Sequence, residues 1–404
     1  MSVHALMFGW EYPPKHLGGL GVACQGLVRG LLKHGTKVTL VLPHGEAEED
    51  HGITLLSPTE TQRATIRIKS SLQPYDSPES FLKRTVTSNI PKGGITPLYA
   101  DDLGAAVHEF TELAVTLTKD TNPDVVHSHD WMTLGAGAAA AAYHHVPFVA
   151  HIHATELDRT HFRPNEWIYH QERNGLQKAN HIITVSNYTK NILVREYGIA
   201  AEKISVVHNG TEEKVQATAL TTMQPLHPMV LFIGRLTVQK GPFHFLEAAR
   251  MVHDHMPNVE FVVAGEGYLL PELIERSCAL GLERNAIFAG KVSSTEAREL
   301  YKHASCFVMP STSEPFGLVA LEAIAHGAPV ILSKQSGVSE VVPHAFHVDF
   351  WDVSKLADCI LTVLREEPLA MQLRSEAVHT LHHLTWENQA AKVMTIYDNV
   401  RTRF

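Results

Sequence analysis

Two carboxylates, Glu314 and Glu322, lie eight residues apart around a turn that is predicted to begin a helix. Pro315 disfavours helical dihedral angles at Glu314, so we expect Glu314 in the loop before that helix. Gly317 allows the backbone to approach a ligand closely, and the free amides at a helix start favour an anion. Eight residues of helix span about 12 Å, whereas glycosidase carboxylates lie about 5 to 9.5 Å apart. The spacing therefore favours two separate ligand contacts over one acid/base pair. The plain alternative is a helix-start Glu with an unrelated surface Glu.

Two cations, Arg235 and Lys240, follow a predicted strand at Met229–Ile233 and precede a helical pattern. The guanidinium of Arg offers a fork of donors and the ammonium of Lys a point charge, which together suit a phosphate group. An unrelated pair of surface cations is the alternative. The chain has no Asp-x-Asp pair of the kind that often holds a divalent metal in sugar-nucleotide enzymes. We therefore expect a diphosphate to be neutralised by these cations and by helix amides, without a metal ion.

A glycine cluster at Gly18, Gly19 and Gly21 follows the first predicted strand and precedes a helix expected at Val22–His34. Such a turn places backbone amides against a charged or polar ligand. The dinucleotide-binding pattern does not fit, because Cys24 stands where the third glycine is required. A tight turn without a ligand is the alternative to a binding role.

His153 comes directly after a predicted strand at Phe148–His151. A histidine in this position is more often a hydrogen-bonded structural residue, and most of the 27 histidines are expected to be ordinary surface or core residues. A zinc site formed with His127 and His129 is a second interpretation. No carboxylate or cysteine follows at a recognisable ligand spacing, so a metal site is not favoured.

The chain has 404 residues, which indicates two domains. Short apolar strands alternate with helical patterns and restart after the weakly periodic stretch Thr211–Pro228, which predicts two doubly wound parallel sheets. The segment 49–92 contains a possible strand at Ala64–Ile68 and is either a loop near an acceptor site or connecting structure. The strands are expected at Val3–Phe8, Lys37–Leu42, Asp124–His127, Phe148–His151, His181–Val185, Ile204–Val207, Met229–Ile233, Val259–Ala264, Ala286–Phe288, Cys306–Met309 and Pro329–Leu332.

The composition is that of a globular protein in a reducing compartment. The balance of 34 basic and 43 acidic residues argues against a general nucleic-acid partner. The four cysteines are scattered singly, which is typical of buried thiols and not of a disulfide framework. The first residues lack a basic segment typical of a signal peptide, and the Ala-rich run Leu134–Ala142 is too short to span a bilayer. We expect a cytoplasmic location and no integral membrane segment.

In their order along the chain, these motifs resemble those of the retaining glycosyltransferases of family four, which have the GT-B fold of two Rossmann-like domains. Within that family the chain looks most like bacterial glycogen and starch synthases. The resemblance covers nearly the whole chain. One departure is His16, which stands where glycogen synthases commonly have a lysine. The matching segments are Trp10–Pro14 with Gly18–Gly21, Pro123–Trp131, His153, Val185–Tyr188, Val207–Gly210, Gly234–Leu236 with Lys240–Gly241, Ala264–Gly267 and Glu314–Glu322.

The resemblance implies a role for each matched residue. Arg235 and Lys240 would hold the donor diphosphate, and Glu314 would contact the donor sugar or face the reacting carbon. Glu322 would accept hydrogen bonds from the ribose hydroxyls, and His153 would line the reacting sugar and stabilise positive charge there. The remaining donor contacts would come from Gly18 and Gly19 and from the amides of Phe316, Gly317 and Leu318, while Glu11 and Asp130 would contact acceptor or sugar hydroxyls.

The resemblance also implies domain boundaries and a reaction. Residues 1–212 would bind the acceptor, residues 213–385 the nucleotide sugar, and residues 386–404 would form a helix that crosses back to the first domain. A hexose, expected to be glucose supplied as ADP- or UDP-glucose, would be transferred with retention to an acceptor such as an α-glucan. No cofactor and no metal are expected. The alternatives are transfer of another sugar or to another acceptor, a sugar-nucleotide epimerase or hydrolase, and a catalytically silent glycan-binding subunit.

Overall fold

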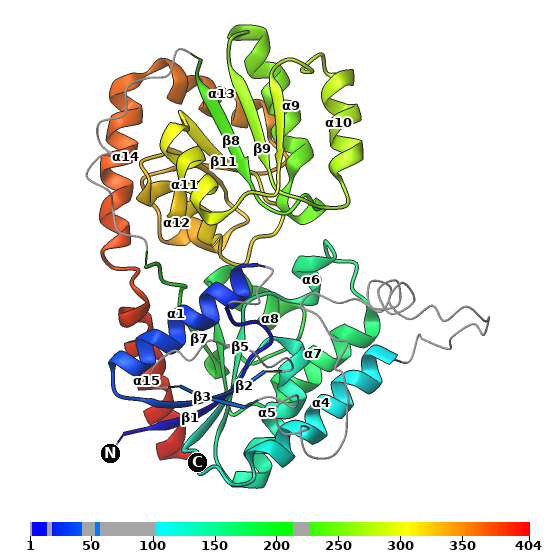
Figure 1. The fold of residues 1–404 in the computed structure, drawn as a ribbon, viewed down its shortest axis with the longest axis vertical. Coiled ribbons are helices and arrows are strands. Elements are labelled where there is room, and N and C mark those ends of the chain that lie inside the picture. The colour runs from blue at the N-terminus through cyan, green and yellow to red at the C-terminus, as the bar shows by residue number, and fades with distance from the viewer. Residues whose placement is uncertain (1, 14–17, 43–52, 57–101, 213–226) are drawn as a thin grey trace, which may run out of the picture.

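The computed structural model describes residues 2–13, 18–42, 53–56, 102–212 and 227–404. The described residues form two lobes, each built on a parallel sheet covered by helices (Figure 1). The α/β fold with two Rossmann-like domains, predicted from the alternation of strands and helices, is confirmed. The possible strand at Ala64–Ile68, the position of His16 and most of the expected linker lie outside the described residues.

The first sheet has seven strands in the order β3-β2-β1-β4-β5-β6-β7, all parallel. The chain order reverses between β1 and β4, which is where ligands bind in folds of this class. The strands are β1 His4–Phe8, β2 Lys37–Val41, β3 Ile53–Leu56, β4 Val125–His129, β5 Phe148–Ile152, β6 His181–Thr184 and β7 Ile204–Val206.

Helices pack against this sheet in two groups. One group is formed by α1, Gly19–Lys33, and the final helix α15, Trp386–Arg403, which lies against α1 and joins the first apolar core. The other group contains α4 Asp102–Thr118, α5 Trp131–His144 and α7 Glu166–Lys178. Two further helices, α6 Glu156–Arg159 and α8 Asn187–Arg195, follow the strands β5 and β6.

The second sheet has six parallel strands in the order β10-β9-β8-β11-β12-β13. Successive strand residues face opposite sides of the sheet, so Val230 and Phe232 of β8 join one apolar core and Leu231 joins another. The strands are β8 Met229–Ile233, β9 Glu260–Ala264, β10 Ala286–Gly290, β11 Cys306–Met309, β12 Val330–Ser333 and β13 Phe346–Val348; the helices are α9 Pro242–His255, α10 Leu270–Ala279, α11 Ser294–His303, α12 Leu318–Ala325, α13 Val353–Arg365 and α14 Glu367–Leu381.

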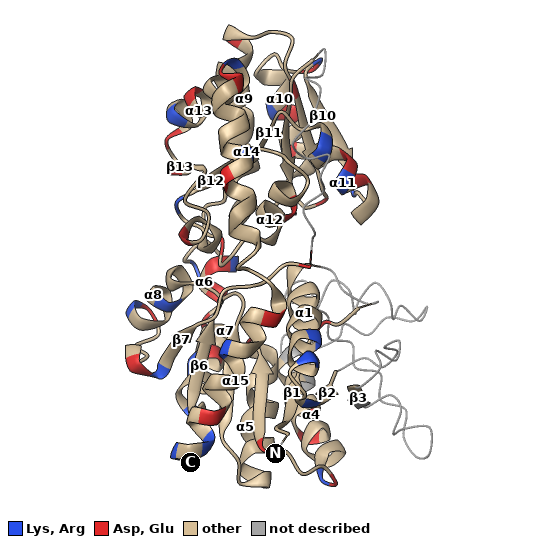
Figure 2. Cartoon of the chain, turned by 90° about the vertical axis from the view of Figure 1, so that its left-hand side faces the viewer, with Lys and Arg blue, Asp and Glu red and all other residues tan. Residues whose placement is uncertain are grey.

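The observed elements differ from the sequence expectations mainly at their ends. The first helix begins at Gly19, three residues before the expected start, so the glycine turn forms its first turn. Strands β3 and β13 were not predicted. Both are short strands at an outer edge of their sheets. Basic and acidic side chains are interspersed over the described parts of both lobes (Figure 2).

Three groups of polar contacts join the two lobes. The Ser313 hydroxyl donates to Asp158 Oδ1 at 2.5 Å and lies 3.0 Å from the Tyr188 hydroxyl. Glu340 accepts hydrogen bonds from the first backbone amides of α8. Thr211 donates its amide to the Leu384 carbonyl at 2.7 Å, close to the start of α15. The loop that contains Glu314 is therefore in direct contact with the first lobe.

Candidate active site

One cavity lies where the glycine turn of the first lobe faces the cations of the second lobe. It has a volume of about 260 Å³. It is lined by the ends of strands and the starts of helices from both sheets, as expected for ligand sites of doubly wound folds. A larger hollow of about 880 Å³ is formed by α4, α5 and α7, away from these groups. The smaller cavity is lined by Gly18, Gly19, Leu20, Asp130, His153, Ala154, Arg159, Asn209, Gly234, Arg235, Gln239, Lys240, Glu314, Pro315, Phe316, Gly317, Leu318 and Val319.

Lys240 and Glu314 form an ion pair in this cavity, with 2.5 Å between Lys240 Nζ and Glu314 Oε2. Both side chains are largely buried, with 19% and 8% of their surface exposed. Ser311 also donates to Glu314 Oε2, at 3.2 Å. A dry ion pair is sensitive to any new charge beside it, so an anion that enters the cavity would draw Lys240 away from Glu314.

Local backbone geometry places these groups. Gly241, next to Lys240, has a left-handed backbone with φ 68°. A Cβ atom at this position would lie 2.1 Å from the Pro310 carbonyl oxygen, so only glycine fits. Gly317 has φ 109° and immediately precedes α12. Glu314 lies before this helix, as predicted, and its amide donates to the Gln335 carbonyl at 2.9 Å. The first amides of α12 and the side chain of Arg235 therefore border the same cavity.

Asp130 supports the turn that carries His153. Its Oδ1 accepts the backbone amides of His153 at 2.7 Å and of Ala154 at 3.3 Å. Burial raises the pKa of Asp130 to about 6, although the charge of Arg159 opposes the shift. Asp130 itself has φ 57°, which is uncommon for a residue with a side chain.

His153 is buried, and burial lowers its pKa to about 3. The ring is therefore neutral near pH 7 and cannot act as a general acid. Its Nε2 lies 2.9 Å from His129 Nδ1, and its buried Nδ1 has no hydrogen-bond partner in the described part of the chain. A buried polar atom without a partner costs stability, and a substrate hydroxyl would satisfy it.

His127, His129, His151 and His153 form two hydrogen-bonded pairs on one face of strands β4 and β5. His127 Nε2 lies 3.2 Å from His151 Nδ1, and the second pair is the one described above. Burial also lowers the pKa of His127, to about 3. Donor atoms of His127, His129 and His151, and separately of Cys24, His129 and His153, lie within 4.8 Å of one another. Neutral imidazoles can ligate a metal, but hydrogen bonding accounts for the spacing within each pair.

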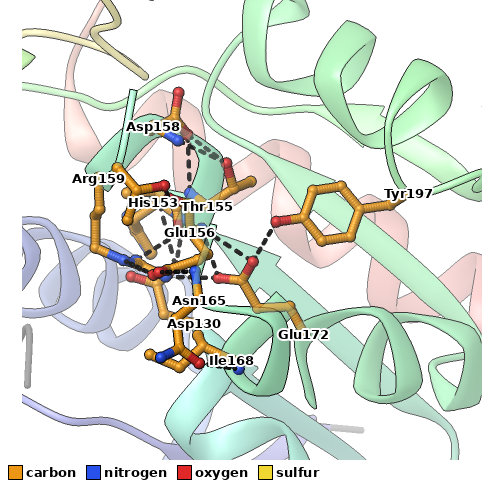
Figure 3. Close-up of polar contacts among 12 residues, drawn as sticks. Asp130, His153, Thr155, Glu156, Asp158, Arg159, Asn165, Ile168, Glu172 and Tyr197 are labelled. Atoms are coloured by element: carbon orange, nitrogen blue, oxygen red, sulfur yellow. Dashed lines mark hydrogen bonds and ion pairs between the residues drawn. The ribbon is translucent and has the colours of Figure 1, made fainter. Parts of the chain in front are cut away.

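A buried charged network lies beside His153 (Figure 3). Arg159 donates to Glu172 Oε1 at 2.6 Å, to Glu156 Oε2 at 3.3 Å and to the Ala154 carbonyl at 3.0 Å. Burial alone would lower the pKa of Arg159, but Glu172 and Glu156 outweigh it and raise the pKa overall. Tyr197 also donates to Glu172. The charge of Arg159 is therefore neutralised by the protein while the residue borders the cavity.

Two predicted residues lie outside this cavity. Glu11 is buried and its Oε2 accepts the Gly21 amide at 3.2 Å, within the first turn of α1. Glu322 accepts a hydrogen bond from the Tyr301 hydroxyl at 3.1 Å. It lines a neighbouring hollow of about 140 Å³ between α12 and α1, which shares Leu318 with the main cavity. The structure thus brings together the other ten predicted residues, and Glu322 adjoins them.

The structure adds Arg159, Asn209 and Gln239 to the residues that line the cavity. The sequence contained a signal for the short helix that carries Arg159, because Thr155 and Asp158 are spaced as in a helix-capping box directly after a strand. Both halves of that box form: Asp158 Oδ2 accepts the Thr155 amide at 2.8 Å, and the Asp158 amide donates to Thr155 Oγ1 at 3.2 Å. The position of Arg159 against Ala154 depends on packing and could not be predicted.

Two family models match consecutive parts of the chain. The family described as Glycosyltransferase Family 4 matches residues 17–214, and that described as Glycosyl transferases group 1 matches residues 223–380. Together they take up most of the sequence. The chain is therefore a glycosyltransferase of the family 4 type with the GT-B architecture, and the resemblance found in the sequence motifs is confirmed.

Known relatives agree with this assignment. The glycogen synthase of Mycobacterium tuberculosis is 27% identical over 412 residues, which cover 97% of this chain and 94% of the relative. Sucrose-phosphate synthase from Thermosynechococcus elongatus has the same fold, with a TM-score of 0.77 at 19% identity and full coverage of both chains. The fold is also shared by HepE from Anabaena, solved with UDP and glucose, with a TM-score of 0.70 at 19% identity over 98% of this chain and 100% of that chain.

None of the helices in the described part of the chain combines the length and the apolar character that crossing a bilayer requires.

Proposed function

We propose that this glycosyltransferase moves a hexosyl group, most simply glucosyl, from a nucleoside diphosphate sugar to an acceptor hydroxyl with retention of anomeric configuration. The observation that carries the proposal is the convergence of Arg235, Lys240, Glu314 and the start of α12 with the glycine turn of the other lobe in one cavity. Cations and helix amides of this kind suit a diphosphate leaving group.

In the proposed reaction the bond between the anomeric carbon and the leaving phosphate oxygen breaks, and the acceptor oxygen bonds to that carbon on the same face. The acceptor proton passes to the departing phosphate oxygen, so no protein nucleophile is consumed. The transition state resembles an oxocarbenium ion. Arg235 and Lys240 would stabilise the charge that develops on the diphosphate. Glu314 and the neutral His153 would border the sugar, and Glu322 in the adjoining hollow would accept from the ribose.

The donor and the acceptor are proposed from relatives. HepE was solved with UDP and glucose, and the Mycobacterium tuberculosis relative is a glycogen synthase. We therefore propose UDP- or ADP-glucose as donor and an α-glucan as acceptor. The cation pair and the helix amides would neutralise the diphosphate without a metal ion. Transfer of another sugar, or to another acceptor, uses the same cavity.

The proposal is tested by nucleotide binding and by product analysis. The melting temperature is measured with ADP, UDP and GDP, because a ligand that binds only the folded state raises it. The enzyme is then incubated with UDP- or ADP-glucose and glycogen, with and without EDTA. Lengthened glucan that forms in EDTA supports the proposal. Free sugar or an epimer as the sole product would indicate a hydrolase or an epimerase, and activity abolished by EDTA would overturn the metal-free mechanism.

A further inference from the structure

Four aromatic side chains from both lobes are in ring contact, and we refer to them together with the adjacent Phe162 as the aromatic rim. His161 and Phe162 follow α6 in the first lobe, His244 belongs to α9, and Phe350 and Trp351 follow β13 in the second lobe. Phe350 is the centre of the group. Its ring centroid lies 6.4 Å from His161, 5.3 Å from His244 and 4.9 Å from Trp351. The rim thus spans the boundary between the lobes.

Each part of the rim is connected to a residue that lines the cavity. His161 comes two residues after Arg159, and His244 comes four residues after Lys240. Phe350 is linked through Gln335, whose side-chain oxygen accepts the Phe350 amide at 3.4 Å and whose carbonyl accepts the Glu314 amide at 2.9 Å. The rim is therefore linked through short segments and through Gln335 to residues that line the cavity of the proposed transfer reaction.

The outer rings of the rim are held at the surface at an energetic cost. Trp351 is 61% exposed and Phe162 is 47% exposed. His161 and Phe162 have φ angles of 52° and 59°, two consecutive left-handed residues without a glycine. Such backbone geometry is unfavourable for residues other than glycine and is concentrated at ligand-binding sites. The Phe162 amide donates to the Leu157 carbonyl at 2.9 Å, which fixes this turn. Burial of the Phe162 ring does not offset the cost, since the ring stays half exposed.

The rim lies on a different side of the site from the hollow of Glu322. That hollow is lined by residues of α12, α1 and α15, whereas the first-lobe part of the rim follows α6, which lies on the other side of the first lobe from α1 and α15 (Figure 1). If the nucleoside end of the donor extends toward Glu322, the side of the site near the rim stays open for a second substrate, the acceptor.

We propose that the aromatic rim is a binding subsite for the acceptor glycan, which packs the apolar faces of its hexose rings on Trp351, Phe350 and Phe162. This inference rests on the proposed glucosyl transfer. Aromatic rings offer a large, rigid contact surface, and an extended oligosaccharide presents matching C–H faces. Because rim residues adjoin residues that line the cavity of the proposed transfer reaction, the occupant is the carbohydrate chain that receives the sugar.

Direct binding of maltoheptaose tests the subsite. Its affinity is measured calorimetrically in the presence of saturating UDP for the wild type, Phe162→Ala, Trp351→Ala and the double variant. The matched control is Tyr143→Ala, since Tyr143 is a 48% exposed ring at the end of α5, away from the cavity. We expect the double variant to bind maltoheptaose at least about 10-fold more weakly, equivalent to about 1.4 kcal/mol. The control is expected to bind as the wild type does.

Kinetics distinguish this inference from the proposed function. In the double variant the KM for maltoheptaose should rise, while the melting-temperature shift with UDP and the slow hydrolysis of donor without acceptor stay at wild-type values. Unchanged maltoheptaose affinity in the double variant, or no maltoheptaose binding by a wild type that binds UDP, would overturn the subsite. A wild type that binds maltoheptaose at the rim but transfers no sugar would instead overturn the proposed function.

Discussion

At the scale of single residues, the most informative contact is the ion pair between Lys240 and Glu314. The sequence places a cation after one strand and a carboxylate before a helix 74 residues later. Their 2.5 Å contact shows that the two motifs serve one site. In the proposed reaction Lys240 exchanges this carboxylate for the donor diphosphate. Lys240 is then needed mainly when charge develops on the leaving group.

Lys240→Ala should therefore lower kcat by about 10²- to 10³-fold, as the loss of one charge-stabilising donor does in other enzymes. The measurement is the initial rate of glucosyl transfer at saturating donor. Lys302→Ala is the control, because Lys302 pairs with Glu299 on the exposed surface of α11. A Lys240→Ala enzyme with nearly wild-type kcat would contradict the assigned role.

The buried histidines make stability depend on pH. The folded pKa of His127 is about 3, below the unfolded value of about 6.5. Between these two pKa values His127 is protonated in the unfolded chain but not in the folded chain. The free energy of unfolding therefore falls as the pH drops from about 6.5 to about 3. One such group changes it by about 1.4 kcal/mol per pH unit. Asp130 has the opposite effect, since its folded pKa of about 6 lies above its unfolded value.

His127→Gln should reduce the slope of unfolding free energy against pH between pH 4 and 6 by up to one proton. Glutamine can still bond to the Tyr397 hydroxyl, which lies 2.5 Å from His127 Nδ1. Urea unfolding at a series of pH values gives the slope. His108→Gln is the control, because that side chain is 75% exposed. An unchanged slope in His127→Gln would show that the buried imidazole already carries a proton in this range. The wild type, His127→Gln and His108→Gln all contain Asp130, so its contribution cancels when their slopes are compared.

At the scale of elements, the close crossing of α1 and α15 joins the end of the chain to its beginning. Gly26 and Gly30 allow the approach. A Cβ at Gly30 would lie 2.5 Å from the Trp386 carbonyl oxygen and 2.8 Å from the Ala390 Cβ, and one at Gly26 would meet the Trp386 ring. Trp386, Val393 and Tyr397 are buried in the first core. The glycines therefore determine how closely the final helix docks.

Gly30→Ala should lower the free energy of unfolding by about 1–3 kcal/mol, because the added methyl group overpacks the crossing. The sign is informative, since alanine in an isolated helix would be favoured by about 1 kcal/mol. Chemical denaturation of both proteins measures the difference. Asn399→Ala serves as the control at an exposed position of α15. A more stable Gly30→Ala protein would mean that α15 does not pack on α1 in this way.

At the scale of the whole molecule, Glu340 couples the two lobes. It lies at the end of a short turn in the second lobe and accepts the amides of Asn187 at 2.9 Å and Tyr188 at 2.7 Å, together with His208 Nε2 at 3.1 Å. Although burial alone would raise the pKa of Glu340, these hydrogen bonds lower it overall. The carboxylate thus binds the positive start of α8 across the lobe boundary.

Glu340→Ala should loosen this contact and increase the radius of gyration of the nucleotide-free enzyme. Small-angle X-ray scattering measures the change, and Glu275→Ala is the control at an exposed position of α10 in the same lobe. Saturating UDP should partly restore the compact form if the nucleotide is bound between the lobes. Identical scattering from Glu340→Ala and the wild type would mean that other contacts hold the lobes together.

Much of this arrangement follows from the sequence alone. Apolar runs such as Met229–Ile233 and Cys306–Met309 define buried parallel strands, and both coincide with the observed strands. Local rules also placed Glu314 before its helix and the glycine turn at the start of α1. These features depend on dihedral preferences and hydrophobic periodicity, which act between residues close in the chain.

The tertiary structure decided which of these groups meet. It paired Lys240 with Glu314, brought Arg159 against the turn of His153, and left Glu11 to accept the Gly21 amide within α1. It also gathered the aromatic rim from three separate segments. The Lys240–Glu314 pair and the aromatic rim join residues far apart in the sequence, and they are fixed only when strand order and the packing of the two lobes are set. Spacing along one chain carries no information about that packing.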